Sequence, residues 1–212
     1  MLLFVISSSN INCFRAHLNR FNMSAEDSIQ PSDHPSQPQF SKASLKVFLI
    51  GFMGCGKTHW GRQLAEAMGV PFFDLDEKLA EKEGKAITQI FADEGEEYFR
   101  LLEKDALHLL TESHETFIMA CGGGTPCFYN NIDYMNAQGT TVWINCSVEC
   151  LHKRLVKERS TRPLIKELSD NDLRSYIIKK FGDRKIFYQQ AGLIIQEEEM
   201  SLQDLMDRII NK

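Results

Sequence analysis

Residues 46–58 read Lys46-Val-Phe-Leu-Ile50-Gly51-Phe-Met-Gly54-Cys-Gly56-Lys57-Thr58, an apolar run that leads into the pattern G-x-x-x-x-G-K-[ST]. Val47–Ile50 has the length and apolarity of a buried strand, and Thr58–Met68 places apolar side chains along one face of a helix. A glycine-rich loop between a strand and a helix is the setting in which this pattern binds phosphate groups. The stretch therefore predicts an α/β fold with a nucleotide-phosphate site.

The residue types of this loop, a P-loop, follow from the chemistry of phosphate binding. Glycines let successive backbone N–H groups turn toward phosphate oxygens, and the helix dipole adds positive potential. Lys57 would reach the β- and γ-phosphates, and the Thr58 hydroxyl would ligate the accompanying Mg²⁺. The alternative is a glycine-rich turn that binds nothing. We expect the ATP-binding residues of the loop to be Gly54, Cys55, Gly56, Lys57, Thr58 and His59.

The composition is typical of one globular domain, and it favours a small-molecule ligand. The chain has 212 residues, of which 43% are hydrophobic and 25% are charged. That length holds one α/β domain of ordinary size with some residues left over. The formal net charge of −5 shows none of the excess of basic residues that is typical of nucleic-acid-binding proteins. The composition therefore favours a small-molecule substrate over a polyanion.

The first 44 residues differ in character from the rest. They contain three of the six prolines and several polar, Ser-rich stretches, which are typical of a disordered, dispensable extension. Leu2–Ile6 is too short for a signal-peptide core or a membrane span. We therefore expect a tail at residues 1–44, a single domain at 45–212, no membrane association and a cytoplasmic location. An organellar address stays open, because two arginines precede the first acidic residue.

The cysteines and histidines give no sign of a structural metal site. The six cysteines include no C-x-x-C pair, and no histidine stands at a metal-binding spacing from them. We expect free thiols in a reducing compartment and no structural zinc.

Strands and helices alternate along the domain. Further strands are predicted at Val70–Phe73, Thr116–Ala120, Thr140–Ile144 and Leu193–Ile195. Helices are predicted at Ala86–Ser113, with a break near Gly95, and after the capping residues Ser147, Ser169 and Ser201. This alternation predicts a parallel sheet with helices on both faces. Such sheets bind ligands beyond the carboxyl ends of their strands, which selects the loops Gly51–Lys57, Asp74–Asp76 and Gly122–Pro126.

Two of these loops carry candidate site residues besides the P-loop. Asp74 and Asp76 follow a strand at i and i+2, which suits one carboxylate for a metal and one for an acceptor hydroxyl. The alternative is a pair of acids that merely opens a helix. Gly122, Gly123 and Gly124 would let a ligand approach the backbone closely, whereas the alternative is a flexible turn.

The basic residues are less informative by themselves. Arg100 lies three residues before Glu103 on a predicted helix, and Arg184 lies on another; both fit exposed ion pairs equally well. The segment 153–166 is rich in Lys and Arg and bends at Arg162-Pro163. It fits either a segment that closes over a nucleotide or a solvated charged face.

Taken in order, these residues resemble those of shikimate kinases, which belong to the nucleoside-monophosphate-kinase-like group of P-loop proteins. The resemblance runs from about Lys46 to the C-terminus. Its motifs are the P-loop, Asp74-Leu-Asp76, Ile90 to Arg100 with Glu103, Gly122-Gly-Gly124, Arg162-Pro-Leu164, and Arg184 four residues before Tyr188. Their order and spacing carry the likeness more than any single later motif.

The resemblance implies a fold and an activity. The fold is a three-layer α/β P-loop kinase with a five-stranded parallel sheet in the order 2-3-1-4-5, helices on both faces and a small mobile lid at about residues 153–168. The activity is ATP-dependent phosphorylation of the 3-hydroxyl of shikimate, a step of aromatic amino acid biosynthesis. Mg²⁺ is the implied cofactor, and we expect a monomer.

The resemblance also implies residue roles. The catalytic residues would be Lys57, Asp76 and Arg162, with Asp76 binding the shikimate hydroxyls and accepting a proton. The shikimate-binding residues would be Asp76, Arg100, Gly122, Gly123, Gly124 and Arg184, of which the two arginines hold the carboxylate. Thr58 and Asp74 would position Mg²⁺. Arg162 would reach the ATP phosphates from the lid.

Three features depart from the family pattern: Gly192 stands where Asp is frequent, His59 follows Thr58, and the lid is short. None removes a residue assigned to the chemistry. Two alternatives remain, namely a gluconate-type kinase of the same fold and a nucleotide-binding relative without catalysis.

Overall fold

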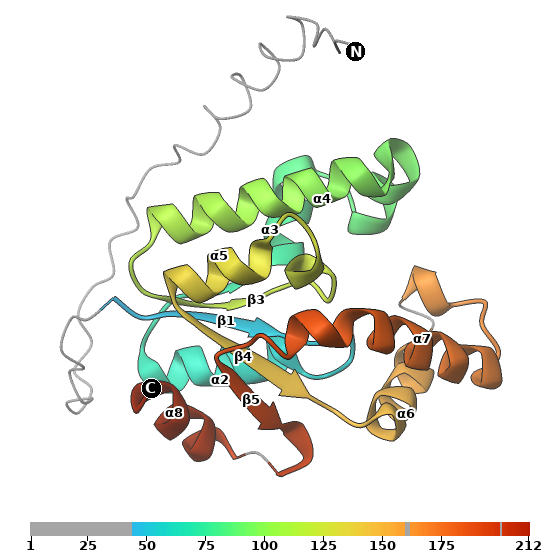
Figure 1. Ribbon diagram of the computed structural model, residues 1–212. Helices are drawn as coiled ribbons and strands as arrows, with labels where there is room; N and C mark the ends of the chain where they lie inside the picture. Colours follow the sequence, from blue (N-terminus) through green and yellow to red (C-terminus); the bar gives the residue numbers. More distant parts are fainter. Residues whose placement is uncertain (1–43, 160–161, 200) are drawn as a thin grey trace, which may run out of the picture. The chain divides into compact units, whose positions relative to one another are not determined.

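A five-stranded sheet forms the centre of the domain. The computed structural model describes residues 44–159, 162–199 and 201–212. The strands are β1 (Lys46–Ile50), β2 (Phe72–Asp74), β3 (Phe117–Ala120), β4 (Thr140–Asn145) and β5 (Leu193–Gln196). Their order is β2-β3-β1-β4-β5, and every neighbouring pair is parallel. The predicted α/β class and strand order are confirmed (Figure 1).

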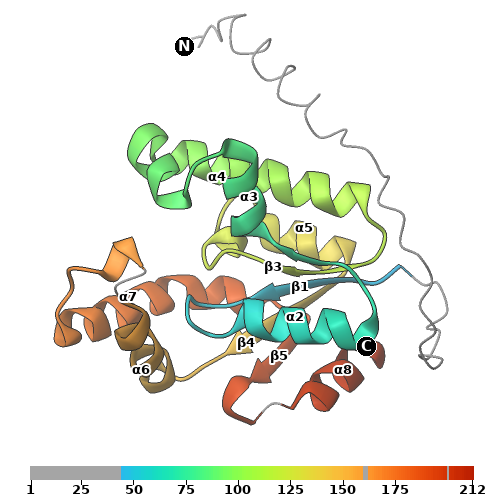
Figure 2. The same cartoon turned by 180° about the vertical axis from the view of Figure 1, so that it is seen from behind.

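Helices cover both faces of the sheet. They are α2 (Lys57–Met68), α3 (Leu75–Glu83), α4 (Ile87–Ser113), α5 (Asn131–Gln138), α6 (Val148–Glu158), α7 (Asp170–Tyr188) and α8 (Leu202–Ile210). Short 3₁₀ turns are η1 (Thr125–Cys127), η3 (Pro163–Ile165) and η4 (Glu197–Glu199). Figures 1 and 2 show α3, α4 and α5 on one face and α2 and α8 on the other. Among the described residues, no helix has the length and apolarity of a membrane span.

The central strands are apolar on both sides because both sides are covered. Val47 and Leu49 of β1 belong to the core under α2, α6 and α8. Phe48 and Ile50 belong to the core under α3, α4 and α5. All four side chains are fully buried. A continuous apolar run is therefore the expected pattern for this strand.

The predicted capping residues begin their helices as expected. Ser147, Ser169 and Ser201 each accept a hydrogen bond from the backbone N–H three residues later, at the starts of α6, α7 and α8. The sequence patterns did not predict α5. Its eight residues mix polar and apolar types without a clear helical face, and only Asn131, Ile132 and Met135 are buried.

The predicted tail and lid are described only in part. Of the tail, only Ser44 lies within the described residues, and its Oγ donates to the backbone oxygen of Glu115 at 2.9 Å. Of the lid range 153–168, the first six residues complete α6, where Leu155 is fully buried. Arg162 and η3 follow after the undescribed residues 160 and 161.

Candidate active site

Three loops meet where β1, β2 and β3 end. The parallel register pairs Ala120 of β3 with both Leu49 of β1 and Asp74 of β2. The strands therefore end level with one another, and the loops that follow them emerge side by side. A cavity of about 460 Å³ lies at this edge. This is where parallel α/β sheets bind their ligands.

The P-loop is shaped to present backbone N–H groups. Gly56 caps α2 in a left-handed conformation (φ 93°) that favours glycine, and no side chain caps the helix there. The first turn of α2 thus has N–H groups available for an anion. Lys57 Nζ donates to the backbone oxygens of Gly51 at 2.9 Å and Phe52 at 3.0 Å. The ammonium group is held over its own loop, where phosphate oxygens would compete with these carbonyls.

Thr58 and Asp74 lie together at the cavity. Thr58 Oγ1 donates to Asp74 Oδ2 at 2.7 Å. The other carboxylate oxygen of Asp74 accepts from the backbone N–H groups of Asp76 at 3.1 Å and Glu77 at 3.4 Å, which caps α3. The helix start therefore fixes the carboxylate. A hydroxyl and a carboxylate are the oxygen ligands that Mg²⁺ prefers.

Asp76 lies in the cavity with an altered proton affinity. The surrounding protein atoms, followed by the neighbouring Glu103 and Asp74 carboxylates, raise the pKa of Asp76 to about 6. Lys57 and Arg100 act in the opposite direction but do not cancel the rise. Protein atoms surround the carboxylate, yet the residue is exposed to the solvent in the cavity. A carboxylate with this pKa accepts a proton more readily than an ordinary aspartate.

Arg100 is buried against the glycine loop. A Cβ placed on Gly124 would lie 2.7 Å from both terminal nitrogens of Arg100, so only glycine leaves room for the guanidinium. Arg100 is 7% exposed and donates to Glu103 Oε2 at 2.8 Å. Thr125 Oγ1 donates to the other oxygen of Glu103 at 2.5 Å. This buried network fixes both the arginine and the loop.

Arg184 approaches the same loop from α7. Its Nη1 lies 3.3 Å from the Cβ position of Gly123, and its guanidinium lies over the Phe52 ring at 5.8 Å. Tyr188, one turn later on α7, donates its hydroxyl to the Gly123 backbone oxygen at 2.5 Å. Helices α4 and α7 therefore bring two arginines to neighbouring glycines.

The cavity gathers most of the predicted site residues. Those that line it are Gly54, Gly56, Lys57, Thr58, His59, Asp74, Asp76, Gly122, Gly123 and Arg162. Those that do not line it are Cys55, Arg100, Gly124 and Arg184. Cys55 is only 1% exposed and packs into the core. The two arginines and Gly124 lie next to the lining, around the glycine loop.

His59 and Arg162 lie at the cavity with local partners. His59 is exposed, and its Nε2 lies 2.7 Å from the Gln63 side-chain nitrogen. Arg162 pairs with Glu158, whose Oε2 accepts from Nη2 at 2.6 Å and from Nε at 2.8 Å. The roles of both residues toward a nucleotide stay predictions.

Among the cavity residues that the sequence patterns did not select, Arg154 and Glu197 form an ion pair. Arg154 donates to Glu197 with 2.8 Å to each carboxylate oxygen, and its Nη1 lies 3.3 Å from the backbone oxygen of Gly54. Both side chains line the cavity. In the sequence, Arg154 was one of several basic residues and Glu197 one of three successive acids. The pair joins positions 43 apart, so no local pattern signals it.

A P-loop, a hydroxyl–carboxylate pair and an acidic group beside two arginines define a P-loop kinase for a small acidic substrate. The family model for shikimate kinase matches residues 53–212. The chain belongs to the shikimate kinase family.

Individual relatives agree with this assignment. A shikimate kinase of Parabacteroides distasonis is 44% identical over 155 residues, which are 73% of this chain and 89% of the relative. One of Azobacteroides pseudotrichonymphae is 39% identical over 167 residues, 79% of this chain and 98% of the relative.

Solved structures show the same architecture. The shikimate kinase of Bacteroides thetaiotaomicron has a TM-score of 0.73 and 34% identity, covering 79% of this chain and 97% of that one. The Acinetobacter baumannii enzyme, solved in complex with shikimate, has a TM-score of 0.67 and 31% identity, covering 80% of this chain and 93% of that one.

Proposed function

We propose that this kinase transfers the γ-phosphoryl group of ATP to the 3-hydroxyl of shikimate, giving shikimate 3-phosphate and ADP for aromatic amino acid biosynthesis. The observation that carries the proposal is the position of Arg100 and Arg184 against neighbouring glycines, with Asp76 3.2 Å from the Cβ position of Gly122 in the same loop. Guanidinium groups grip a carboxylate by paired hydrogen bonds, and shikimate combines a carboxylate with hydroxyls.

The proposed reaction uses positioning and charge rather than a covalent intermediate. The 3-hydroxyl oxygen forms a bond to the γ-phosphorus while the bond from that phosphorus to the β–γ bridging oxygen breaks. Asp76 receives the hydroxyl proton. Lys57 and Arg162 neutralise the negative charge on the phosphate oxygens, and the ADP oxygen leaves with the electron pair.

Thr58 and Asp74 are the residues that would hold Mg²⁺. Their oxygens lie 2.7 Å apart at the cavity, and both are of the type that suits this ion. Bound together with ATP, Mg²⁺ would offset the charge of the phosphate oxygens.

We further propose that the protein acts as a monomer and that it works in a reducing compartment such as the cytoplasm. A single chain supplies every residue assigned to the reaction. The five cysteines within the described residues are free thiols, which suits such a compartment.

The decisive experiment measures ADP release from Mg-ATP with shikimate, with gluconate and with nucleoside monophosphates. We expect turnover to require shikimate and to be lost in Asp76→Asn. Equal turnover with gluconate would reassign the substrate, while ATP binding without turnover on any acceptor would indicate a non-catalytic relative.

A further inference from the structure

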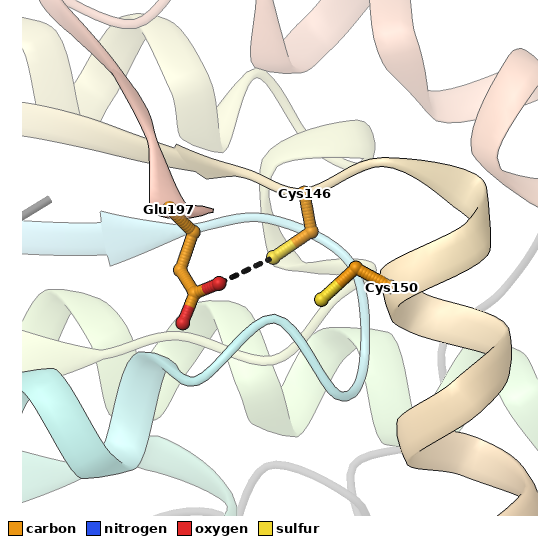
Figure 3. Close-up of side chains that lie close together, drawn as sticks. All are labelled: Cys146, Cys150 and Glu197. Carbon is orange, nitrogen blue, oxygen red and sulfur yellow. Dashed lines mark hydrogen bonds between the residues drawn. The ribbon is translucent and has the colours of Figure 1, made fainter. Parts of the chain in front are cut away.

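A second group of potential ligands lies beside the P-loop, on the β4–β5 side. The thiols of Cys146 and Cys150 and one carboxylate oxygen of Glu197 all lie within 4.8 Å of one another (Figure 3). The sheet register explains the meeting, because Asn145 of β4 pairs with Gln196 of β5. Cys146 and Glu197 directly follow this pair and leave the sheet side by side. Cys150 comes from the first turn of α6.

The donor types favour a thiophilic cation. Two thiolates and a carboxylate are ligands for Zn²⁺ and related ions, whereas Mg²⁺ prefers oxygen ligands alone. Three protein ligands leave one position of a tetrahedron for water. The group is therefore chemically distinct from the Thr58–Asp74 pair.

The carboxylate is already oriented toward the thiols. Glu197 Oε2 lies 3.8 Å from Cys146 Sγ, while Oε1 lies 3.4 Å from the indole nitrogen of Trp60. Arg154 donates to both carboxylate oxygens at 2.8 Å. Partners of this kind fix the direction of metal-binding carboxylates in proteins.

Arg154 also balances the charge of a loaded site. A divalent cation with two thiolates and one carboxylate carries one net negative charge. The guanidinium of Arg154, with Nη1 3.8 Å from Cys146 Sγ, supplies the matching positive charge. A neutral assembly lowers the cost of placing these charges beside the core.

We propose that Cys146, Cys150 and Glu197 form a binding site for one thiophilic divalent cation of the Zn²⁺ class. Binding forms two metal–sulfur bonds and one metal–oxygen bond, and it releases the two thiol protons to solvent. No electron is transferred.

The two thiols differ in exposure. Cys146 is 3% exposed and belongs to the core. Cys150 is half-buried and gives an approach from outside. The expectation of no structural zinc relied on Cys and His spacing along the chain. It did not consider Glu197, which lies 51 positions from Cys146.

The test is a Co²⁺ titration of the full chain in a thiol-free reductant. We expect one ion per chain, a near-ultraviolet thiolate-to-cobalt band, release of two protons and displacement by Zn²⁺. Cys146→Ser and Cys150→Ser should each reduce the band. Cys127→Ser is the matched control and should leave it unchanged, because Cys127 is a partly buried thiol in η1 outside the group. Glu197→Gln should retain a band but weaken affinity about 10-fold or more.

An unchanged band in the Cys146→Ser/Cys150→Ser double variant would overturn the proposal, as would no band in the parent chain. If Cys146→Ser fails to fold, the half-buried Cys150→Ser variant decides the outcome. None of these measurements uses kinase activity, so they stand apart from the test of the proposed function.

Discussion

Asp76 is the residue at which several electrostatic influences meet. Enclosure by protein and the Glu103 and Asp74 carboxylates favour its protonated form, whereas Lys57 and Arg100 favour its charged form. The influences that favour the protonated form are the larger ones, so the pKa of Asp76 is raised to about 6. The same group would accept the proton in the proposed reaction, so its titration has consequences for both activity and stability.

The first prediction concerns the pH dependence of activity. Because protonated Asp76 cannot accept a proton, kcat/KM for shikimate should fall as the pH drops below about 6. In Asp76→Asn, kcat should fall about 10²- to 10⁴-fold and this acidic limb should disappear. Steady-state rates between pH 5 and 8 test this. An acidic limb that persists in the variant would assign it to another group.

The second prediction concerns stability. The folded-state pKa of Asp76 lies above its ordinary value of 3.8, so ionisation destabilises the fold as the pH rises from about 4 to 6. Asp76→Asn should therefore be more stable than the parent at pH 8, and this advantage should vanish near pH 4. Its size should be on the order of 1 kcal/mol, because cavity water screens the carboxylate. Urea unfolding at both pH values would measure it, and equal differences would contradict it.

The third prediction concerns Gly124. In Gly124→Ala the new methyl group would overlap the Arg100 guanidinium, which Glu103 holds in place. Displacement of the guanidinium from the proposed carboxylate site should raise KM for shikimate about 10- to 100-fold. KM for ATP should change little, since Arg100 lies against the glycine loop and does not line the cavity beside the P-loop. A rise in both constants would indicate collapse of the whole site.

At the scale of elements, α4 shows how a helix positions a site residue. The helix is interrupted at Gly95, where φ is 85° and ψ is 174°. The predicted break near Gly95 is thereby confirmed. Phe99 and Arg100, one turn later, are buried, so the interruption sets the direction in which the second part of α4 enters the core.

The fourth prediction is that Gly95→Ala destabilises the protein by about 1–3 kcal/mol, because this backbone region is open almost only to glycine. The cause would be strain alone, since a Cβ at Gly95 would meet no atom of the described residues within 4 Å. Gly182 in α7 is the matched control, because a Cβ there would also be free of contacts with the part of the chain that the structure describes, and its φ is not positive. Gly182→Ala should stabilise the helix by about 0.5–1 kcal/mol. Chemical denaturation of both variants tests the pair, and equal effects would refute the strain argument.

At the scale of the whole molecule, the described residues from Ser44 onward belong to one compact unit. The described part of the chain carries all the residues assigned to substrate and nucleotide.

The fifth prediction is that residues 44–212 alone suffice for activity. A chain of that range should show kcat and both KM values within about twofold of the full protein, a difference of less than about 0.5 kcal/mol in transition-state stabilisation. A larger loss of kcat would assign residues 1–43 a part in catalysis. An unchanged kcat with a lower unfolding midpoint would assign them to stability.

The sequence by itself determined the P-loop, the parallel sheet and most element boundaries. These features depend on local signals, such as the apolar run at Val47–Ile50, the glycines before Lys57 and the capping serine Ser147. Local signals also selected Asp74, Asp76 and the three glycines as loop residues at strand ends. They did not predict α5, whose residues have no clear apolar face.

Only the tertiary structure decided which side chains meet. Arg100 and Arg184 come from helices far apart in the chain, and their shared contact with the glycine loop depends on how α4 and α7 pack around the sheet. The pairing of β4 with β5 brings Cys146 to Glu197 in the same way. Hydrophobic burial sets this packing without regard to sequence distance. The chain order alone therefore does not reveal such contacts.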